Sequence, residues 1–231
     1  LVGMLPHGRR RDFVFDGRTG KLHRTSHQRH LASDSVRQFD LHAARLHLRL
    51  FEHFFDRIDG AVRNARFVEQ LAGEVKDKVG WPGLLVGDLS QPRGGPMLTG
   101  HWSHQVGLDA DIWLTPMPDR ILSPEEREDM SAASMLKAPF NVDPAIFTTM
   151  QMKLIRRAAS YPQVARIFVH PAIKKALCRE AGPDRGWLTK VRPYWGHDYH
   201  FHVRIRCPEG ETGCTAQPPV PPGDGCGKEL D

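Results

Sequence analysis

Apolar and polar side chains alternate along residues 195–207, "WGHDYHFHVRIRC", and this period of two predicts a β-strand. Neighbouring side chains of a strand point to opposite faces. One face therefore carries Phe201, Val203 and Ile205, which suit burial in a core. The other face carries His200, His202 and Arg204. Two imidazoles side by side suit a metal ligand with a second imidazole close by, although two surface histidines would show the same spacing.

The rest of the chain mixes predicted helices and strands without strict alternation. Apolar runs predict strands at 84–90, 107–114 and 164–170. Helical spacing, capping signals and stop signals predict helices at 35–58, 64–79, 123–130, 148–160 and 171–182. The helix at 123–130 has the clearest start, because Ser123 and Glu126 can form a capping box around Pro124. This mixture predicts an α+β fold, in which a small central antiparallel sheet is flanked by helices.

Composition and charge narrow the class of function. The 231 residues are 40% hydrophobic and 26% charged, as in ordinary globular proteins. The formal net charge of +5 belongs to residues 1–70, where 13 Lys and Arg face 8 Asp and Glu; the remaining residues carry 19 of each. The main body therefore gives no support for a nucleic-acid partner. No apolar run approaches the roughly 18 residues of a transmembrane helix, so we expect no transmembrane segment.

Four cysteines, Cys178, Cys207, Cys214 and Cys226, lie within the last 54 residues, and none forms a CxxC motif. Their even number favours two disulfides and an oxidising compartment over four free thiols in the cytosol. Three pairings are open; the short polar loop between Cys207 and Cys214 favours that pair, which leaves Cys178 with Cys226. The opening residues lack the apolar core of a signal peptide, so we expect an export signal to be absent from this chain.

A partner for the histidine strand lies upstream, in "GHWSHQVGLDADIW", residues 100–113. His104 lies in a predicted turn seven residues before Asp111, and Gly107 lets the chain bend between them. With His202 they form a His-Asp-His set. Three protein ligands and one open position are the pattern of a catalytic zinc site, whereas a closed structural site uses four ligands. The chain has no HExxH, GxSxG, P-loop or GxGxxG motif, which argues against the enzyme classes that use them.

Two segments, "GGPMLTGHWSHQVGLDADIWL" and "WGHDYHFHVRIRCP", resemble the penicillin-insensitive murein endopeptidases. This family is part of a metallopeptidase group with lysostaphin, the D-Ala-D-Ala peptidases and the hedgehog-type domains. The group's signature is H-x6-D followed about ninety residues later by H-x-H, and this chain has both parts. The resemblance covers about residues 66–231. Residues 1–64 do not resemble the family, so we expect an N-terminal arm of uncertain structure at 1–64 and a catalytic domain at 65–231.

The resemblance implies a site on the sheet face that holds one Zn²⁺ per chain. Its implied zinc ligands are His104, Asp111 and His202. It implies His200 as the base and places His101 and His197 along the site. It also implies the disulfides Cys178–Cys226 and Cys207–Cys214. From the chemistry of such sites we add Asp109, either as the acceptor that orients a ligand imidazole or as a solvated strand carboxylate. His101, His197 and Arg93 are the candidate donors to the developing oxyanion, and His101 is the first choice.

The implied function is zinc-dependent hydrolysis of D-amino-acid cross-links, of the D-Ala–diaminopimelate type, in bacterial peptidoglycan. Penicillin would not inhibit it, because no serine-type nucleophile is present to be acylated. We expect a periplasmic protein with peptidoglycan as its partner and a homodimer as a candidate assembly. Two alternatives stay open: a D,D-carboxypeptidase or dipeptidase of the same group, and a non-catalytic, zinc-stabilised module that binds the cell wall.

Overall fold

The computed structural model describes residues 11–16, 21–26, 37–39, 59–90, 95–96, 102–209 and 214–230. The helices in this part of the chain are α2 (Asp59–Lys78), α3 (Pro124–Asp129), α4 (Thr149–Ser160), α5 (Pro171–Glu180) and two 3-10 turns, Gly186–Lys190 and Lys228–Leu230. The strands are β1 (Arg11–Asp16), β2 (Lys21–Ser26), β3 (Arg37–Phe39), β4 (Leu84–Val86), β5 (Asp109–Trp113), β6 (Leu136–Ala138), β7 (Asn141–Val142), β8 (Val164–Val169), β9 (Val191–Pro193) and β10 (His200–Ile205).

Within the described residues, the largest sheet has the strand order β3-β4-β5-β10-β8-β9, and the pairs β1-β2 and β6-β7 form two small sheets. The mixed α+β class is therefore confirmed. The large sheet is antiparallel except at one edge, where β8 and β9 run parallel. The prediction of a small central antiparallel sheet therefore holds for the other strand pairs and not for this edge. Between β8 and β9 the chain passes through α5 and a 3-10 turn, the kind of crossover that parallel neighbours require.

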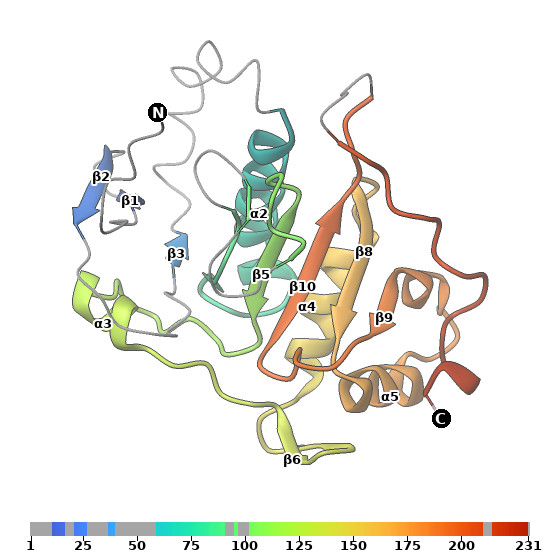
Figure 1. Ribbon diagram of the computed structural model, residues 1–231. Helices are drawn as coiled ribbons and strands as arrows, with labels where there is room; N and C mark the ends of the chain where they lie inside the picture. The colour runs from blue at the N-terminus through green and yellow to red at the C-terminus, as the bar shows by residue number, and fades with distance from the viewer. Residues whose placement is uncertain are drawn as a thin grey trace.

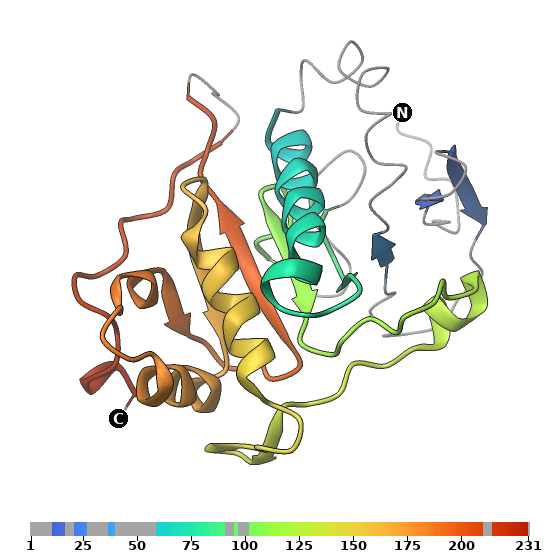
Figure 2. The ribbon, with the colours of Figure 1, turned by 180° about the vertical axis from the view of Figure 1, so that it is seen from behind.

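The hydrophobic core lies between the large sheet and the helices α2 and α4. Figure 2 shows these two helices across one face of β5, β10 and β8, and Figure 1 shows the opposite face. Helix α2 buries Phe67, Leu71 and Val75, and helix α4 buries Leu154, Ile155 and Ala158. From β10 the core receives Phe201, Val203 and Ile205, the face that the alternating pattern assigned to it. The polar side chains of β10 consequently point to the face away from α2 and α4.

Most predicted elements form at the expected places. The capping box of Ser123 and Glu126 starts α3, and Gly182 follows α5 in the left-handed region, with φ +69. Helix α2 begins at Asp59, five residues before its predicted start. The helix predicted at 35–58 is wrong at Arg37–Phe39, which forms β3 on the edge of β4; residues 40–58 lie outside the described part of the chain. No described helix is long and apolar enough to cross a membrane.

The structure contains both disulfides, Cys178–Cys226 and Cys207–Cys214. The first fastens the C-terminal segment to α5. Basic side chains add further attachments: Arg166 donates to the carbonyl of Pro218, Arg192 to that of Pro221, and Lys174 to that of Asp224. The segment thus follows the edge of the sheet as an extended chain (Figure 1).

Candidate metal centre

The candidate ligands come from two adjacent strands and one turn. In the antiparallel register of β5 and β10, Asp111 lies directly opposite His202. His104 lies in the turn that leads into β5. That turn needs a glycine at 107, where φ is +74 and a Cβ would lie 2.7 Å from the Cβ of Ala61 on α2. The bend anticipated at Gly107 therefore brings His104 back over the strand.

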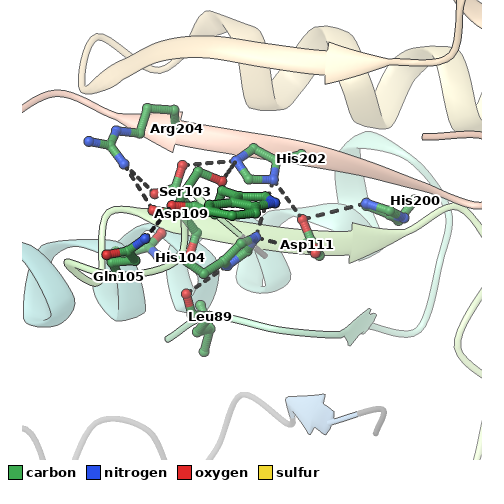
Figure 3. Close-up of polar contacts among 11 residues, drawn as sticks. Leu89, Ser103, His104, Gln105, Asp109, Asp111, His200, His202 and Arg204 are labelled. Carbon is green, nitrogen blue, oxygen red and sulfur yellow. Dashed lines mark hydrogen bonds and ion pairs between the residues drawn. The ribbon is translucent and has the colours of Figure 1, made fainter. Parts of the chain in front are cut away.

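Figure 3 shows the side chains of His104, Asp111 and His202 pointing toward one another. His104 Nε2 lies 3.2 Å from His202 Nδ1 and 3.4 Å from Asp111 Oδ2. His202 Nδ1 lies 3.0 Å from Asp111 Oδ1. All three residues are buried. Of the described residues, these three form the one group of His, Cys, Asp and Glu side chains whose geometry could hold a metal ion.

In each of the two imidazoles, the hydrogen bond of the outer nitrogen indicates which nitrogen carries the proton. His104 Nδ1 lies 2.7 Å from the carbonyl oxygen of Leu89, which only accepts, so Nδ1 carries the proton. His202 Nε2 lies 2.8 Å from Asp109 Oδ1 and donates to that carboxylate. When the two imidazoles are neutral, the opposite nitrogens, His104 Nε2 and His202 Nδ1, present lone pairs. Two lone pairs and a carboxylate converge at a point where a cation is needed.

The pKa values of the three side chains also indicate that positive charge is favoured between them. Burial disfavours the charged form of His202, but its contacts with the carboxylates of Asp109 and Asp111 outweigh burial and raise its pKa to about 9. Burial likewise opposes the charged form of His104, yet Asp111 leaves its pKa raised. The pKa of Asp111 lies well below its usual value, because the three histidines around it outweigh its burial. Without metal, a proton supplies the positive charge for which a metal ion competes.

The residues fit zinc in type and in spacing. Zinc is bound by imidazole nitrogen and carboxylate oxygen at about 2.0–2.2 Å, usually in a tetrahedron, whose ligand atoms are then about 3.3–3.6 Å apart. The three separations run from 3.0 to 3.4 Å, so one lies in this range and the other two are shorter by 0.1 and 0.3 Å. Zinc ligands also keep their second ring nitrogen hydrogen-bonded, as both imidazoles do here. The group can therefore bind a metal ion through three ligands and leave further positions open.

The other predicted histidines are placed differently. His200 Nε2 lies 3.6 Å from Asp111 Oδ1, so this buried imidazole stands beside the ligand group without being part of it. The ring of His197 lies 4.9 Å from that of His200, and its Nδ1 donates to the carbonyl of Trp195 at 2.9 Å. Burial, followed by the neighbouring His200, lowers the pKa of His197 to about 4. His101 and Arg93 lie outside the described residues.

The surroundings include Asp109, which was predicted, and several groups that were not. Arg204 donates to Asp109 Oδ2, and Asn64 of α2 donates to the Asp109 carbonyl at 2.7 Å. Ser103 Oγ lies 3.4 Å from His202 Nε2. The alternation had already placed Arg204 on the histidine face, so its participation could have been read from the sequence. The Leu89 carbonyl could not, because a backbone acceptor leaves no trace in residue type.

Comparison with known proteins places this site in a family. The family model described as penicillin-insensitive murein endopeptidase matches residues 54–231. The chain belongs to this family. The murein endopeptidase of Haemophilus influenzae is 45% identical over 177 residues, which are 76% of this chain and 61% of that protein. Those of Klebsiella pneumoniae and Escherichia coli are 44% and 43% identical, and each aligns over 71% of this chain and 60% of its own length.

The chain thus matches about three fifths of the length of these murein endopeptidase relatives. The matched part contains the turn of His104 and the strands of Asp111 and His202, so the entire ligand group lies inside the family match.

Proposed function

We propose that this chain is a zinc-dependent endopeptidase that cleaves D-amino-acid cross-links, of the D-Ala–diaminopimelate type, in peptidoglycan. The observation that carries the proposal is the convergence of His104 Nε2, His202 Nδ1 and the Asp111 carboxylate, three groups of the kinds that bind zinc, at separations of 3.0–3.4 Å. The murein endopeptidase names of the relatives support the substrate class. In this proposal residues 65–231 form the catalytic domain, and the arm at 1–64 has no assigned role.

His104, Asp111 and His202 would hold the ion, one per chain. When bound, zinc supplies Lewis-acid chemistry, because it acidifies water and polarises a carbonyl. His200 stands next to the ligand group and is the proposed base: it takes the proton of the attacking water and returns it to the leaving amine, a role worth about 10²–10⁴-fold. From outside the described residues, His101 and Arg93 are the proposed donors to the developing oxyanion. His197, predicted as a third donor, is a neutral imidazole whose proton is on Nδ1, so its role in the proposal is to line the site.

This mechanism accounts for insensitivity to penicillin, since no side chain in it forms an acyl-enzyme. The two disulfides support an oxidising compartment, and together with a peptidoglycan substrate they make the periplasm the proposed location. Association into a homodimer remains part of the proposal and is tested by measuring the mass of the protein in solution.

The first test is the metal content of native protein beside H104A and D111A, measured by elemental analysis. We expect about one zinc per chain in native protein and none in the two variants. Purified cross-linked muropeptide dimers are then digested with native protein. Loss of dimers supports the endopeptidase. Release of free D-alanine alone would identify a carboxypeptidase, and zinc binding with no product would identify a wall-binding module.

A further inference from the structure

The ligands of the candidate centre belong to two parts of the backbone that need separate attachment. Asp111 and His202 are held by the pairing of β5 with β10. His104 lies in the turn before β5, which ladder hydrogen bonds do not cover. A zinc site of measurable affinity requires that this turn keep a fixed position over the strands, because its three ligands must meet within a few tenths of an ångström.

One guanidinium connects the turn with the strands. Arg204 Nη1 donates to the carboxylate of Asp109 and, at 3.3 Å, to the backbone carbonyl of Ser103, the residue before His104. Figure 3 shows Arg204 on the side of Asp109 away from the ligand group. The same carboxylate accepts from His202 Nε2 through its other oxygen. A single side chain thus contacts the support of one ligand and the backbone next to another.

Burial makes these contacts strong. Arg204 is 8% exposed and Asp109 is fully buried, so neither charge can be solvated well if its partner is lost. Asp109 divides its two oxygens between a ligand imidazole and the guanidinium, which leaves its orientation fixed. Arginine suits the position, because its planar guanidinium group offers several N–H donors in a rigid arrangement.

We propose that Arg204 is a positioning residue for the metal ligands: through Asp109 it orients His202, and through the Ser103 carbonyl it holds the turn that carries His104. The inference rests on the proposed metal site. Arg204 itself is not part of the group that could hold the ion; its hydrogen bonds go to Asp109 and Ser103. Its removal would free the Asp109 carboxylate to rotate and would release the turn, and outer contacts of this kind typically change metal affinity 10–100-fold.

The test is a zinc titration of metal-free protein against a chromophoric chelator, for wild type, R204M and R166M. Arg166 is the matched control, because it is the register partner of Arg204 on β8 and donates instead to the Pro218 carbonyl of the C-terminal segment. We expect R204M to bind zinc 10–100-fold more weakly and R166M to bind within twofold of wild type. The visible spectrum of the Co²⁺-loaded proteins reports ligand geometry, and we expect it to change in R204M alone.

A double-mutant cycle with D109N separates positioning from general destabilisation. In D109N the route through Asp109 is already lost, so R204M should weaken zinc binding less there than in wild type, and what remains reports the Ser103 contact. Additive losses, or wild-type affinity and spectrum in R204M, would overturn the inference. Should R204M fail to fold, R204Q carries the same test: a tenfold loss is expected, and unchanged affinity is contrary evidence. If wild-type protein itself bound no zinc, the proposed metal site would be rejected. That result differs from the outcomes above, which concern Arg204 alone.

Discussion

Two clusters of buried polar side chains differ in how their hydrogen-bonding groups match. In the first, the fully buried Lys174 donates to the carbonyls of Leu188, at 2.9 Å, and Asp224, at 2.5 Å. In this cluster the ammonium donor therefore faces carbonyl acceptors. In the second, His104, His202 and Asp111 turn two ring nitrogens and a carboxylate, all possible metal ligands, toward one another. Burial and charge are common to both, so neither property marks a functional site. The convergence of three metal-ligating groups does, because a proton or a metal ion must lie between them.

The largest effect should come from removing the metal ion that the second cluster is proposed to bind. Dialysis against a chelator is expected to reduce cross-link cleavage to background, and Zn²⁺ should restore it. Mg²⁺ is the control and should fail, since it prefers oxygen ligands in an octahedron. Zinc should also raise the free energy of unfolding of the metal-free protein, by about 4 kcal/mol when free zinc is about 1,000-fold above its dissociation constant. Full activity after verified metal loss would show that the second cluster needs no metal ion for cleavage.

A change beside the ligand group should alter chemistry without altering binding. H200A is expected to keep about one zinc per chain while cleavage falls about 10²–10⁴-fold, because the proposed base is gone. H170N is the control: it keeps a side-chain acceptor for the Ala172 amide at the start of α5, so its activity should be near wild type. Loss of zinc from H200A would instead make His200 a ligand.

The sequence predicted that His104, Asp111 and His202 would lie together, because local patterns encode which side chains share a face. The alternation in β10 put His202 opposite the core-facing Phe201 and Val203, and the H-x6-D spacing supplied His104 and Asp111. Sheet neighbours were not predictable in the same way. Pairing of Arg37–Phe39 with β4 and the parallel approach of β9 to β8 join segments far apart in the chain, and hydrophobic periodicity does not record such contacts.

Changes at the C-terminal segment should show the opposite behaviour, with altered stability and unaltered zinc affinity. In C178A/C226A the unfolded chain regains the freedom of a loop that spans 48 residues, which costs about 4 kcal/mol by loop entropy. The pair Cys207–Cys214 spans 7 residues, so C207A/C214A should cost about 2 kcal/mol. Urea denaturation of the metal-free proteins measures both. A loss of zinc affinity in C178A/C226A would mean that the segment supports the metal centre.

Lys174 tests the matched cluster itself. K174M keeps the length of the side chain but leaves the carbonyls of Leu188 and Asp224 without this donor, at an expected cost of about 1–3 kcal/mol. The neighbouring Lys175 is exposed, and K175M should leave stability within about 0.5 kcal/mol of wild type. Equal stability of K174M and wild type would show that the hydrogen bonds of Lys174 do not stabilise the fold.

The smallest effect is expected at the half-exposed edge of the same cluster, where Arg185 donates to Asp224 at 2.7 Å. This contact lowers the pKa of Asp224, so its stabilisation is present above the unfolded pKa of about 3.9 and is lost as the pH falls through the lower folded value. R185M should therefore cost less than about 1 kcal/mol near pH 7, and the difference from wild type should shrink in acid and at high salt. R179M, which breaks the exposed pair of Arg179 with Glu180, is the control and should change little. A loss in R185M that persists below the folded pKa would assign the effect to the Arg185 hydrogen bond with the Cys178 carbonyl, because that contact does not depend on the charge of Asp224.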